Sequence, residues 1–333
     1  MVLPFRGHFP ETRLRRMRRH AWSREWLREH RLTPHNLVQP LFVREETMEE
    51  SAHAMPAMTP VTLDGLIQKG REALSYGIGS VMLFPIVPAS KKDERASDAV
   101  NPDNLICRAI KHLRHHVPSL GVICDVALDP YTSHGHDGLW RHGDVDNDKT
   151  LEILTRQAIM QADAGCHVLA PSDMMDGRIG AIRQALDRHG AHHVLILSYA
   201  AKYASSLYAP FRDVLGSTRS LQGASKEQYQ MAIANREEAL REVMMDIEEG
   251  ADMVMVKPGL CYLDVLHCLK EHYAFPLAAY HVSGEYAMLH AAAEKGYLSY
   301  DDALLESLLA IKRAGATMII SYGALDAARL LQP

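Results

Sequence analysis

Eight short apolar runs, spread along almost the whole chain, constrain the fold more than any other feature of the sequence. Most are nearly continuous and bounded by turn residues, as expected for strands buried on both faces. They are Gln39–Val43, Ser80–Phe84, Gly121–Val126, His167–Ala170, Val194–Ser198, Met253–Val256, Leu277–His281 and Thr317–Ser321. These runs predict the strands of a covered parallel sheet.

Amphipathic segments of helical length separate the runs. Examples are Asp64–Tyr76, Thr150–Ala164, Lys226–Glu249 and Asp301–Ala314. Glycines stand where helix C-caps are expected, at positions 77, 165, 250 and 315. Eight strands alternating with helices predict an α/β fold, a (β/α)8 TIM barrel. A doubly wound sheet would also alternate, but no GxGxxG or Walker loop follows an early strand.

The first 35 residues differ in charge from the rest. They carry nine Arg and three Glu, a net charge of +6, which leaves −11 for the remainder of a chain whose net charge is −5. A basic segment of this kind could bind nucleic acid or act as a transit peptide. Its interspersed Glu, Trp22 and Trp26 favour an arm that packs on an acidic neighbouring subunit. We therefore expect an arm, 1–35, and one barrel domain, 36–333.

Composition indicates the cellular compartment in which the protein works. No apolar run reaches the roughly 18 residues that span a bilayer, and the N-terminus lacks the apolar stretch of a secretory signal. The five cysteines are scattered without a CxxC pair, which favours a reducing compartment. We expect a cytoplasmic protein with neither membrane nor nucleic acid as a partner.

Polar residues occur at or just after the ends of the predicted strands. A TIM barrel carries its active site at the C-terminal ends of its strands, so these side chains should meet at one mouth. They are Asp125, Asp129, Ser172, Asp173, Lys202, Lys257, Ser283 and Tyr322. This convergence is the main functional prediction from the residues themselves.

Two of these residues are lysines. Lys257 directly follows an apolar run, and Lys202 follows another strand after a short turn. Burial and mutual repulsion should lower the pKa of at least one of them, giving an amine nucleophile that attacks ketones to form Schiff bases. The alternative is that each lysine pairs with a carboxylate and serves only the structure.

The segment Cys124–Gly138 is rich in metal-binding residue types. It contains Asp125, Asp129 and Asp137 together with His134 and His136. The carboxylates suit Mg²⁺, and the His-x-His pair suits zinc. A polar loop whose Asp and His side chains cap turns is the simpler interpretation.

The longest irregular stretch, Tyr203–Ser225, is a candidate active-site lid. This stretch and the helix predicted after it carry Arg212, Lys226 and Gln230, and cationic groups above a barrel mouth suit a carboxylate substrate. Ordinary solvated surface charge is the alternative for each of these residues.

Long motifs within these segments resemble the porphobilinogen synthases, also called 5-aminolevulinate dehydratases. The motif MVMVKPGLCYLD, Met253–Asp264, resembles the Schiff-base motif of that family, and Leu197–Asp213 resembles its second-lysine segment. Similar motifs cover nearly the whole chain from about Arg13. They include APSDMMDGRIGAIR, YHVSGEYAM, LESLLAIKRAGA, FPIVPASKKDERASDA and LVQPLFVRE.

The resemblance implies the fold above and the condensation of two 5-aminolevulinate molecules to porphobilinogen, an early step of tetrapyrrole synthesis. Lys257 would bind the P-side substrate, which supplies the propionate, and Lys202 the A-side substrate, which supplies the acetate. Asp125 would transfer protons. The resemblance implies that Ser283 and Tyr322 hold the P-side carboxylate and that Ser172 lies close to the P-side substrate. It implies that the A-side carboxylate is held by Arg212, Lys226 and Gln230.

The sequence departs from the zinc-dependent members at three positions. Those members have cysteine where this chain has Ala127, Asp129 and Asp137, and thiolates are the ligands that zinc prefers. We therefore expect no catalytic zinc, and a place in the aspartate-rich subgroup that uses Mg²⁺ and a monovalent cation, with Asp129 beside the substrate. Glu242 matches the glutamate of the family's allosteric Mg²⁺ site.

The resemblance further implies an octamer that assembles through the N-terminal arm, and the sequence suggests a lid insertion between Gly216 and Ser225. Other functions remain open at this stage. They are a Schiff-base aldolase of phosphorylated sugars, a metal hydrolase built on His134, His136 and Asp137, and a non-catalytic assembly protein that uses the arginine-rich arm.

Overall fold

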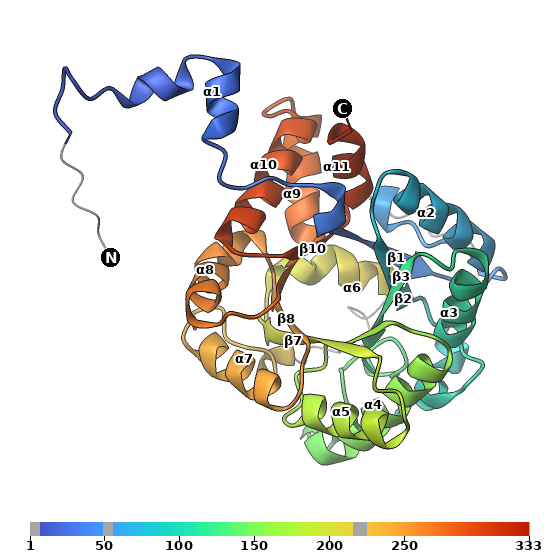
Figure 1. The fold of residues 1–333 in the computed structure, drawn as a ribbon. Helices are drawn as coiled ribbons and strands as arrows, with labels where there is room; N and C mark the ends of the chain where they lie inside the picture. The colour runs from blue at the N-terminus through green and yellow to red at the C-terminus, as the bar shows by residue number, and fades with distance from the viewer. Residues whose placement is uncertain (1–6, 49–55, 216–224, 333) are drawn as a thin grey trace.

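The computed structural model describes residues 7–48, 56–215 and 225–332. Eight parallel strands close into a barrel in the order β1-β10-β9-β8-β7-β6-β3-β2, with helices around it (Figure 1). They are β1 Leu37–Val43, β2 Ser80–Pro85, β3 Gly121–Val126, β6 Val168–Pro171, β7 Leu195–Lys202, β8 Met253–Lys257, β9 Leu277–His281 and β10 Met318–Ser321. The predicted TIM barrel and all eight predicted strands are confirmed.

The helices occupy the amphipathic segments. They are α1 Ala21–Trp26, α2 Leu63–Ser75, α3 Leu105–His116, α4 Asn147–Asp163, α5 Arg178–Arg188, α6 Ala209–Leu215, α7 Glu238–Glu248, α8 Leu263–His272, α9 Ser283–Glu294, α10 Tyr300–Ala314 and α11 Ala324–Leu330. Side chains of Thr62, Asn104, Asp146 and Ser299 accept hydrogen bonds from first-turn N–H groups, as N-caps do. The four predicted C-cap glycines all have positive φ.

Short elements complete the described chain. The 3₁₀ helices are η1 Leu14–Arg18, η2 Pro34–Asn36, η3 Pro56–Met58, η4 Ala89–Lys91, η5 Ser97–Val100, η6 Ser206–Tyr208, η7 Lys226–Gln228 and η8 Leu260–Tyr262. The two-residue strands β4 Trp140–Arg141 and β5 Asp144–Val145 pair with each other after β3.

Two layers of apolar side chains hold the barrel. Side chains such as Phe42, Ile123 and Met255 form a cluster inside it. Alternate residues of the same strands, such as Val43 and Val256, belong to a larger cluster between the strands and the helices. Burial on both faces explains why the strands read as continuous apolar runs.

Strand β7 is longer than predicted, and it contains an extra residue. The pairing with β8 runs Ser198↔Val254 and then Ala201↔Val256, so three steps along β7 face two along β8. This is a β-bulge. The prediction that Lys202 follows a turn is wrong, because the strand continues through the bulge to Lys202, which is the register partner of Lys257.

The predicted single helix Lys226–Glu249 is also wrong. Its first part is the short η7, and α7 begins only at Glu238. The backbone of Met231 instead forms hydrogen bonds to Lys202 and Ala204, which extends the edge of β7. These contacts hold η7 close to the end of β7.

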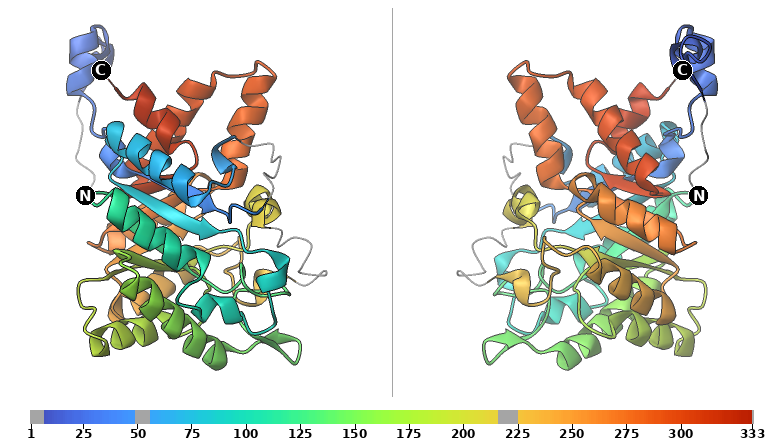
Figure 2. Two further views of the ribbon diagram at one scale, coloured as in Figure 1. Left: turned by 90° about the vertical axis from the view of Figure 1, so that its right-hand side faces the viewer. Right: turned by 90° about the vertical axis from the view of Figure 1, so that its left-hand side faces the viewer.

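The predicted lid is partly helical, with η6 and α6 near one end of the barrel (Figure 2). The predicted insertion, 216–224, lies outside the described residues. Within the described ranges, no helix combines the length and the apolar character needed to cross a membrane.

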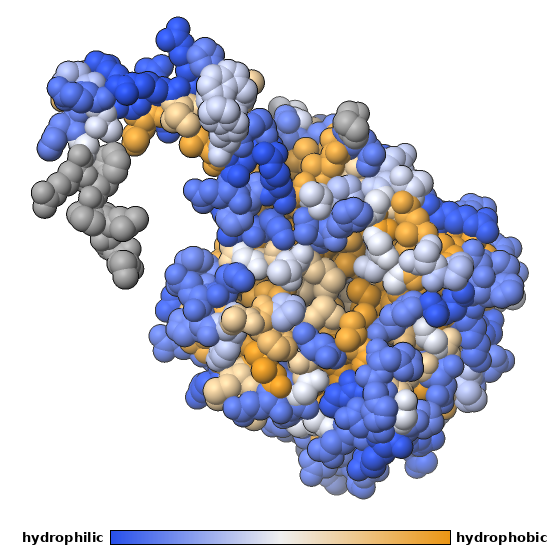
Figure 3. All heavy atoms as spheres, in the orientation of Figure 1, coloured by the Kyte–Doolittle hydropathy of each residue, from blue (hydrophilic) through white to orange (hydrophobic). Residues whose placement is uncertain are grey.

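The described part of the predicted arm lies beside the helices and projects away from the barrel (Figures 1 and 2). Hydrophobic side chains stand out among its hydrophilic ones in the space-filling view (Figure 3). The large aromatic and aliphatic side chains of the arm with the most exposed surface are Phe9, Leu14, Trp22 and Trp26, at 57–76%.

Candidate active site

One cavity lies at the C-terminal ends of the strands, where a TIM barrel carries its chemistry. The described residues that line it are Asp125, Asp129, Ser172, Lys202, Tyr208, Phe211, Arg212, Lys226, Gln230 and Lys257. Eight of these ten were predicted from the sequence, and the exceptions are Tyr208 and Phe211. The structure thus brings together side chains from β3, β7, β8, α6 and the region of η7.

Lys257, the last residue of β8, is 7% exposed and faces into the barrel. Its Nζ lies 4.7–5.2 Å from the ring centroids of four aromatic residues, Tyr199, Tyr208, Phe211 and Tyr280. No carboxylate among the described residues lies within 4.0 Å of this amine. Burial, followed by repulsion from Lys202, lowers the pKa of Lys257 to about 7. The structure therefore presents a largely unpaired amine in an aromatic cage.

The sequence prediction missed this cage, although its members lie within the motifs Leu197–Asp213 and YHVSGEYAM. Tyr199 and Tyr280 occupy inward positions of β7 and β9, so period-two counting along those strands could have found them. Tyr208 also fixes the backbone, because its hydroxyl donates to the Lys257 carbonyl at 2.9 Å. The N–H of Tyr203 donates to the same oxygen at 3.0 Å.

Lys202 has polar surroundings. Its Nζ donates a hydrogen bond to the Ser172 carbonyl and lies 3.9 Å from Oδ1 of Asp137. Both lysines are buried at the mouth, and they sit side by side on paired strands. Two amines of different character therefore face one cavity.

Asp125 ends the inward face of β3 and lines the same cavity. Burial, and then the charge of Asp129, raise the pKa of Asp125 to about 7. A hydrogen bond from Ser172 and the charges of the two lysines act in the opposite direction. This carboxyl group can therefore both give and accept a proton near neutral pH.

Asp129 and Asp137 share the ammonium group of Lys226. These two aspartates correspond to cysteines in the zinc-dependent proteins that the sequence motifs resemble. Nζ of Lys226 lies 3.3 Å from Oδ2 of Asp129 and 3.1 Å from Oδ2 of Asp137. The third position, Ala127, offers no ligand. The part of the chain that the structure describes contains no group of three His, Cys, Asp or Glu residues able to hold a metal. The two carboxylates are therefore engaged by a lysine in this structure.

Ser283 and Tyr322 are buried next to the cage but do not line the cavity. Ser283 begins α9, and its Oγ accepts a hydrogen bond from the N–H of Phe211 at 3.1 Å. The Tyr322 hydroxyl accepts one from Tyr280 at 3.1 Å. Both hydroxyls are thus in contact with members of the cage around Lys257.

The two histidines of the polar loop have structural contacts. His136 stacks on Trp140, and its Nδ1 lies 3.2 Å from the Tyr229 hydroxyl. His134 Nδ1 accepts a hydrogen bond from the N–H of His136 at 3.3 Å. These contacts favour the loop-capping interpretation over a metal hydrolase.

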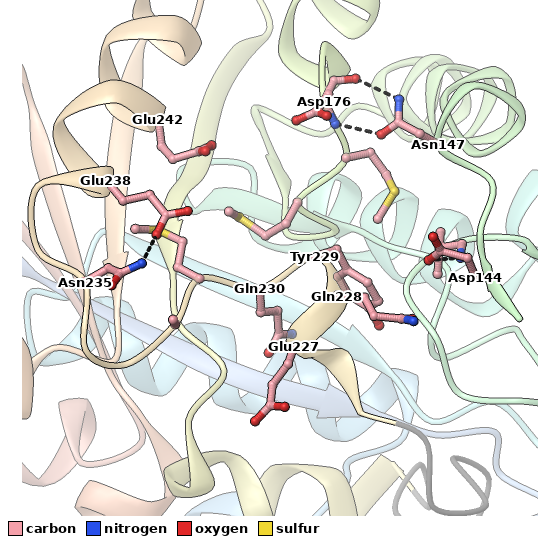
Figure 4. A pocket seen from close by; sticks show the side chains of 15 residues that line it. Asp144, Asn147, Asp176, Glu227, Gln228, Tyr229, Gln230, Asn235, Glu238 and Glu242 are labelled. Atoms are coloured by element: carbon pink, nitrogen blue, oxygen red, sulfur yellow. Dashed lines mark hydrogen bonds between the residues drawn. The ribbon is translucent and has the colours of Figure 1, made fainter.

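Glu242 lies outside this cavity and lines a second one, at the side of α7 (Figure 4). This cavity is acidic, and Gln230 lines both. Burial raises the pKa of Glu242, whereas the charge of Arg178 lowers it. The other acidic residues of the lining are Asp144, Asp176, Glu227 and Glu238.

The comparison with protein families matches residues 11–330 to the model of delta-aminolevulinic acid dehydratase. This chain belongs to that family. The dehydratase of Bradyrhizobium diazoefficiens is 50% identical over 321 residues, which cover 96% of this chain and 91% of that one. The dehydratase of Rhodobacter capsulatus is 45% identical, covering 97% of each chain.

A solved structure of the dehydratase family agrees with the fold. The enzyme of Toxoplasma gondii, in complex with the reaction product porphobilinogen, superposes with a TM-score of 0.93. It is 46% identical, and the match covers 99% of this chain and 92% of that one. The dehydratase fold therefore extends over essentially the whole chain.

Proposed function

We propose that this chain is a porphobilinogen synthase, which joins two molecules of 5-aminolevulinate to porphobilinogen with the loss of two waters, early in tetrapyrrole synthesis. The observation that carries the proposal is the pair of lysines, Lys202 and Lys257, side by side at one barrel mouth. A single essential lysine would suffice for an aldolase, and a non-catalytic protein would need neither.

The first covalent step uses the unprotonated amine of Lys257. Its nitrogen attacks the ketone carbon of the P-side substrate, a C–N bond forms, and the carbonyl oxygen leaves as water after taking up two protons. The product is an iminium that withdraws electrons from the neighbouring carbon. A pKa of about 7 keeps roughly half of the amine free at neutral pH.

Lys202 forms the corresponding Schiff base with the A-side substrate. Arg212, Lys226 and Gln230, which line the cavity, hold the carboxylate of that substrate. Ser283 and Tyr322 hold the P-side carboxylate, and their contacts with the cage support this role. Ser172 and Asp129 lie close to the bound substrates.

Asp125 transfers the carbon-bound proton during condensation. Its position beside Ser172 and its pKa of about 7 suit an acid–base group that changes state in each cycle. Holding both substrates and this carboxyl group in one small cavity lowers the entropic cost of bringing the three groups together for reaction.

Metal ions act away from the lysines in this proposal, and the chain belongs to the aspartate-rich subgroup that uses Mg²⁺ and a monovalent cation. Mg²⁺ keeps several waters and needs only one or two carboxylates, so Glu242 in its acidic cavity suits it (Figure 4).

A zinc-selective thiol chelator should leave the enzymatic activity unchanged, whereas EDTA should lower the activity and added Mg²⁺ should restore it. Strict dependence on zinc contradicts this assignment.

The protein acts in the cytoplasm as a homo-oligomer, an octamer that the N-terminal arms hold together. The exposed aromatic and aliphatic side chains of the arm support this assembly, because they would be covered by a second subunit.

Trapping of the substrate tests the proposed reaction. The protein is incubated with 5-aminolevulinate, reduced with borohydride and digested, and the modified lysines are located by mass spectrometry. We expect an adduct on Lys257. Turnover to porphobilinogen with Lys257 unmodified would exclude a Schiff base on Lys257, and loss of turnover by at least about a thousand-fold in Lys257→Ala would support it.

A further inference from the structure

A buried ionic network lies behind β7, outside the cavity. Arg178, the first residue of α5, is 3% exposed, and its Nη2 lies 3.3 Å from Oδ2 of Asp246 on α7. The same nitrogen donates to Oγ of Ser198 at 3.2 Å and to the carbonyl of Tyr199 at 3.3 Å. The Ser198 hydroxyl in turn donates to Asp246. Arg178 and Asp246 thus bind the strand at the start of its bulge.

The bulge determines which way Lys202 points. Tyr199 faces the inside of the barrel, whereas Ala200 and Ala201 both pack in the outer layer. Two successive outward residues occur only because the bulge interrupts the alternation of the strand. Lys202 consequently faces inward, whereas regular alternation from Tyr199 would place it among the helices.

The bulge also leaves part of the backbone without its usual pairing. Tyr199 and Ala200 have no register partner on β8. A buried carbonyl without a hydrogen bond is costly, and Arg178 supplies the donor for Tyr199. A second arginine contact, 3.8 Å from Nε to Oδ2 of Asp173, ties the network to the segment that follows Ser172.

We propose that Arg178 and Asp246 are positioning residues for the condensation, because they hold the bulge that turns Lys202 toward Lys257. They touch no substrate and act only through the strand. The inference rests on the proposed function, since it concerns the role assigned to Lys202.

The test uses paired substitutions, because Arg178→Met alone leaves the buried carboxylate of Asp246 without its cation and can prevent folding. The variant Arg178→Met/Asp246→Leu removes both charges and roughly conserves volume. Asp173, whose pKa burial raises to about 6, can become neutral in this background. Arg108→Met is the matched control, since Arg108 on α3 pairs with Glu45 across a different part of the barrel.

Borohydride trapping with 5-aminolevulinate then gives the ratio of adducts on the two lysines. We expect the paired variant to lose about tenfold or more of the Lys202 adduct relative to the Lys257 adduct, since small displacements of reacting groups have large effects. The control should keep the wild-type ratio even if its melting temperature falls. A folded paired variant with the wild-type ratio overturns the proposal.

A crystal structure of the paired variant separates this inference from the proposed function. An outward Lys202, or a β7 without its bulge, supports the positioning role whatever the wild-type adducts are. An intact bulge with Lys202 inward refutes it. Absence of adducts on both lysines in the wild-type enzyme, with turnover intact, refutes the proposed mechanism and leaves the crystallographic result to decide the inference.

Discussion

The two lysines at the barrel mouth differ because their neighbours differ. Four aromatic rings surround the amine of Lys257, whereas Lys202 contacts a carbonyl oxygen and lies near Asp137. An amine without a close anion loses its proton more easily in a buried setting. The lowered pKa of Lys257 therefore has two separable causes, burial and the neighbouring cation.

Lys202→Met separates these causes. Removing the repelling cation should raise the pKa of Lys257 above about 7, so that less free amine remains at a given pH. The rate of adduct formation on Lys257 is measured from pH 5 to pH 9 by borohydride trapping. As the pH is lowered, the rate in Lys202→Met should begin to fall at a higher pH than the rate in the wild type. An unchanged acid limb would mean that burial alone sets this pKa.

At the scale of elements, the short helix η7 and the polar loop after β3 are joined by charge. Lys226 is buried, and the charges of Asp129 and Asp137 raise its pKa against the effect of burial. Three charged groups share this small space, and each needs the others because an isolated buried charge is costly.

Lys226→Met should lower the free energy of unfolding by about 3–5 kcal/mol at pH 8, because it removes the nearest cation from two buried carboxylates, Asp129 and Asp137. The loss of unfolding free energy should be smaller at pH 5, where the carboxylates of Asp129 and Asp137 can take up protons in the variant. Urea unfolding at both pH values measures this, with Lys226→Arg as the control that keeps the charge. Equal losses for Met and Arg would show that size, and not charge, matters at this position.

The element η6 contributes a contact that a conservative change can remove. Tyr208→Phe keeps the ring beside Lys257 but deletes the hydrogen bond to its carbonyl. We expect kcat/KM to fall by about twofold to tenfold, the effect of one buried hydrogen bond. Tyr203→Phe is a matched control, because the buried Tyr203 hydroxyl has no hydrogen-bond partner among the described residues. Equal kinetics in both variants would argue against the positioning role of Tyr208.

The strands and most of the cavity could be predicted from the sequence because both follow simple periodicity. Burial on two faces marked the strands, and polar residues at their ends marked the site. The position of Lys202 within β7 could not be predicted, since a bulge leaves no residue pattern of its own and depends on Arg178 and Asp246, which are distant in sequence. The pairing of Met231 with the end of β7 likewise overrode the helical pattern of Lys226–Glu249.

At the scale of the whole molecule, the arm exposes apolar surface that the barrel does not cover. Trp22 and Trp26 contact each other edge to face and remain 57% and 74% exposed. Such aromatic side chains are typical of residues at the centre of interfaces. The charge difference between the basic arm and the acidic remainder favours contact between copies.

Trp22→Ser/Trp26→Ser should therefore yield a smaller assembly in sedimentation velocity experiments. The urea midpoint of barrel unfolding should change little, because these side chains do not pack in the core. Trp140→Phe serves as a comparison that keeps the arm intact. An unchanged sedimentation coefficient would exclude the arm as the main contact between subunits.

The bulge in β7 also bears on how this enzyme can change over time. Between Ser198 and Lys202, Tyr199 belongs to the cage around Lys257, whereas the side chains of Ala200 and Ala201 only pack in the outer layer. Point changes at Ala200 or Ala201 preserve the direction of every later side chain. Deletion of either alanine would remove the bulge, and in the resulting regular strand Lys202 would still face inward opposite Lys257. Alignments of descendants should therefore show one or two residues between Tyr199 and Lys202, with both of these residues kept.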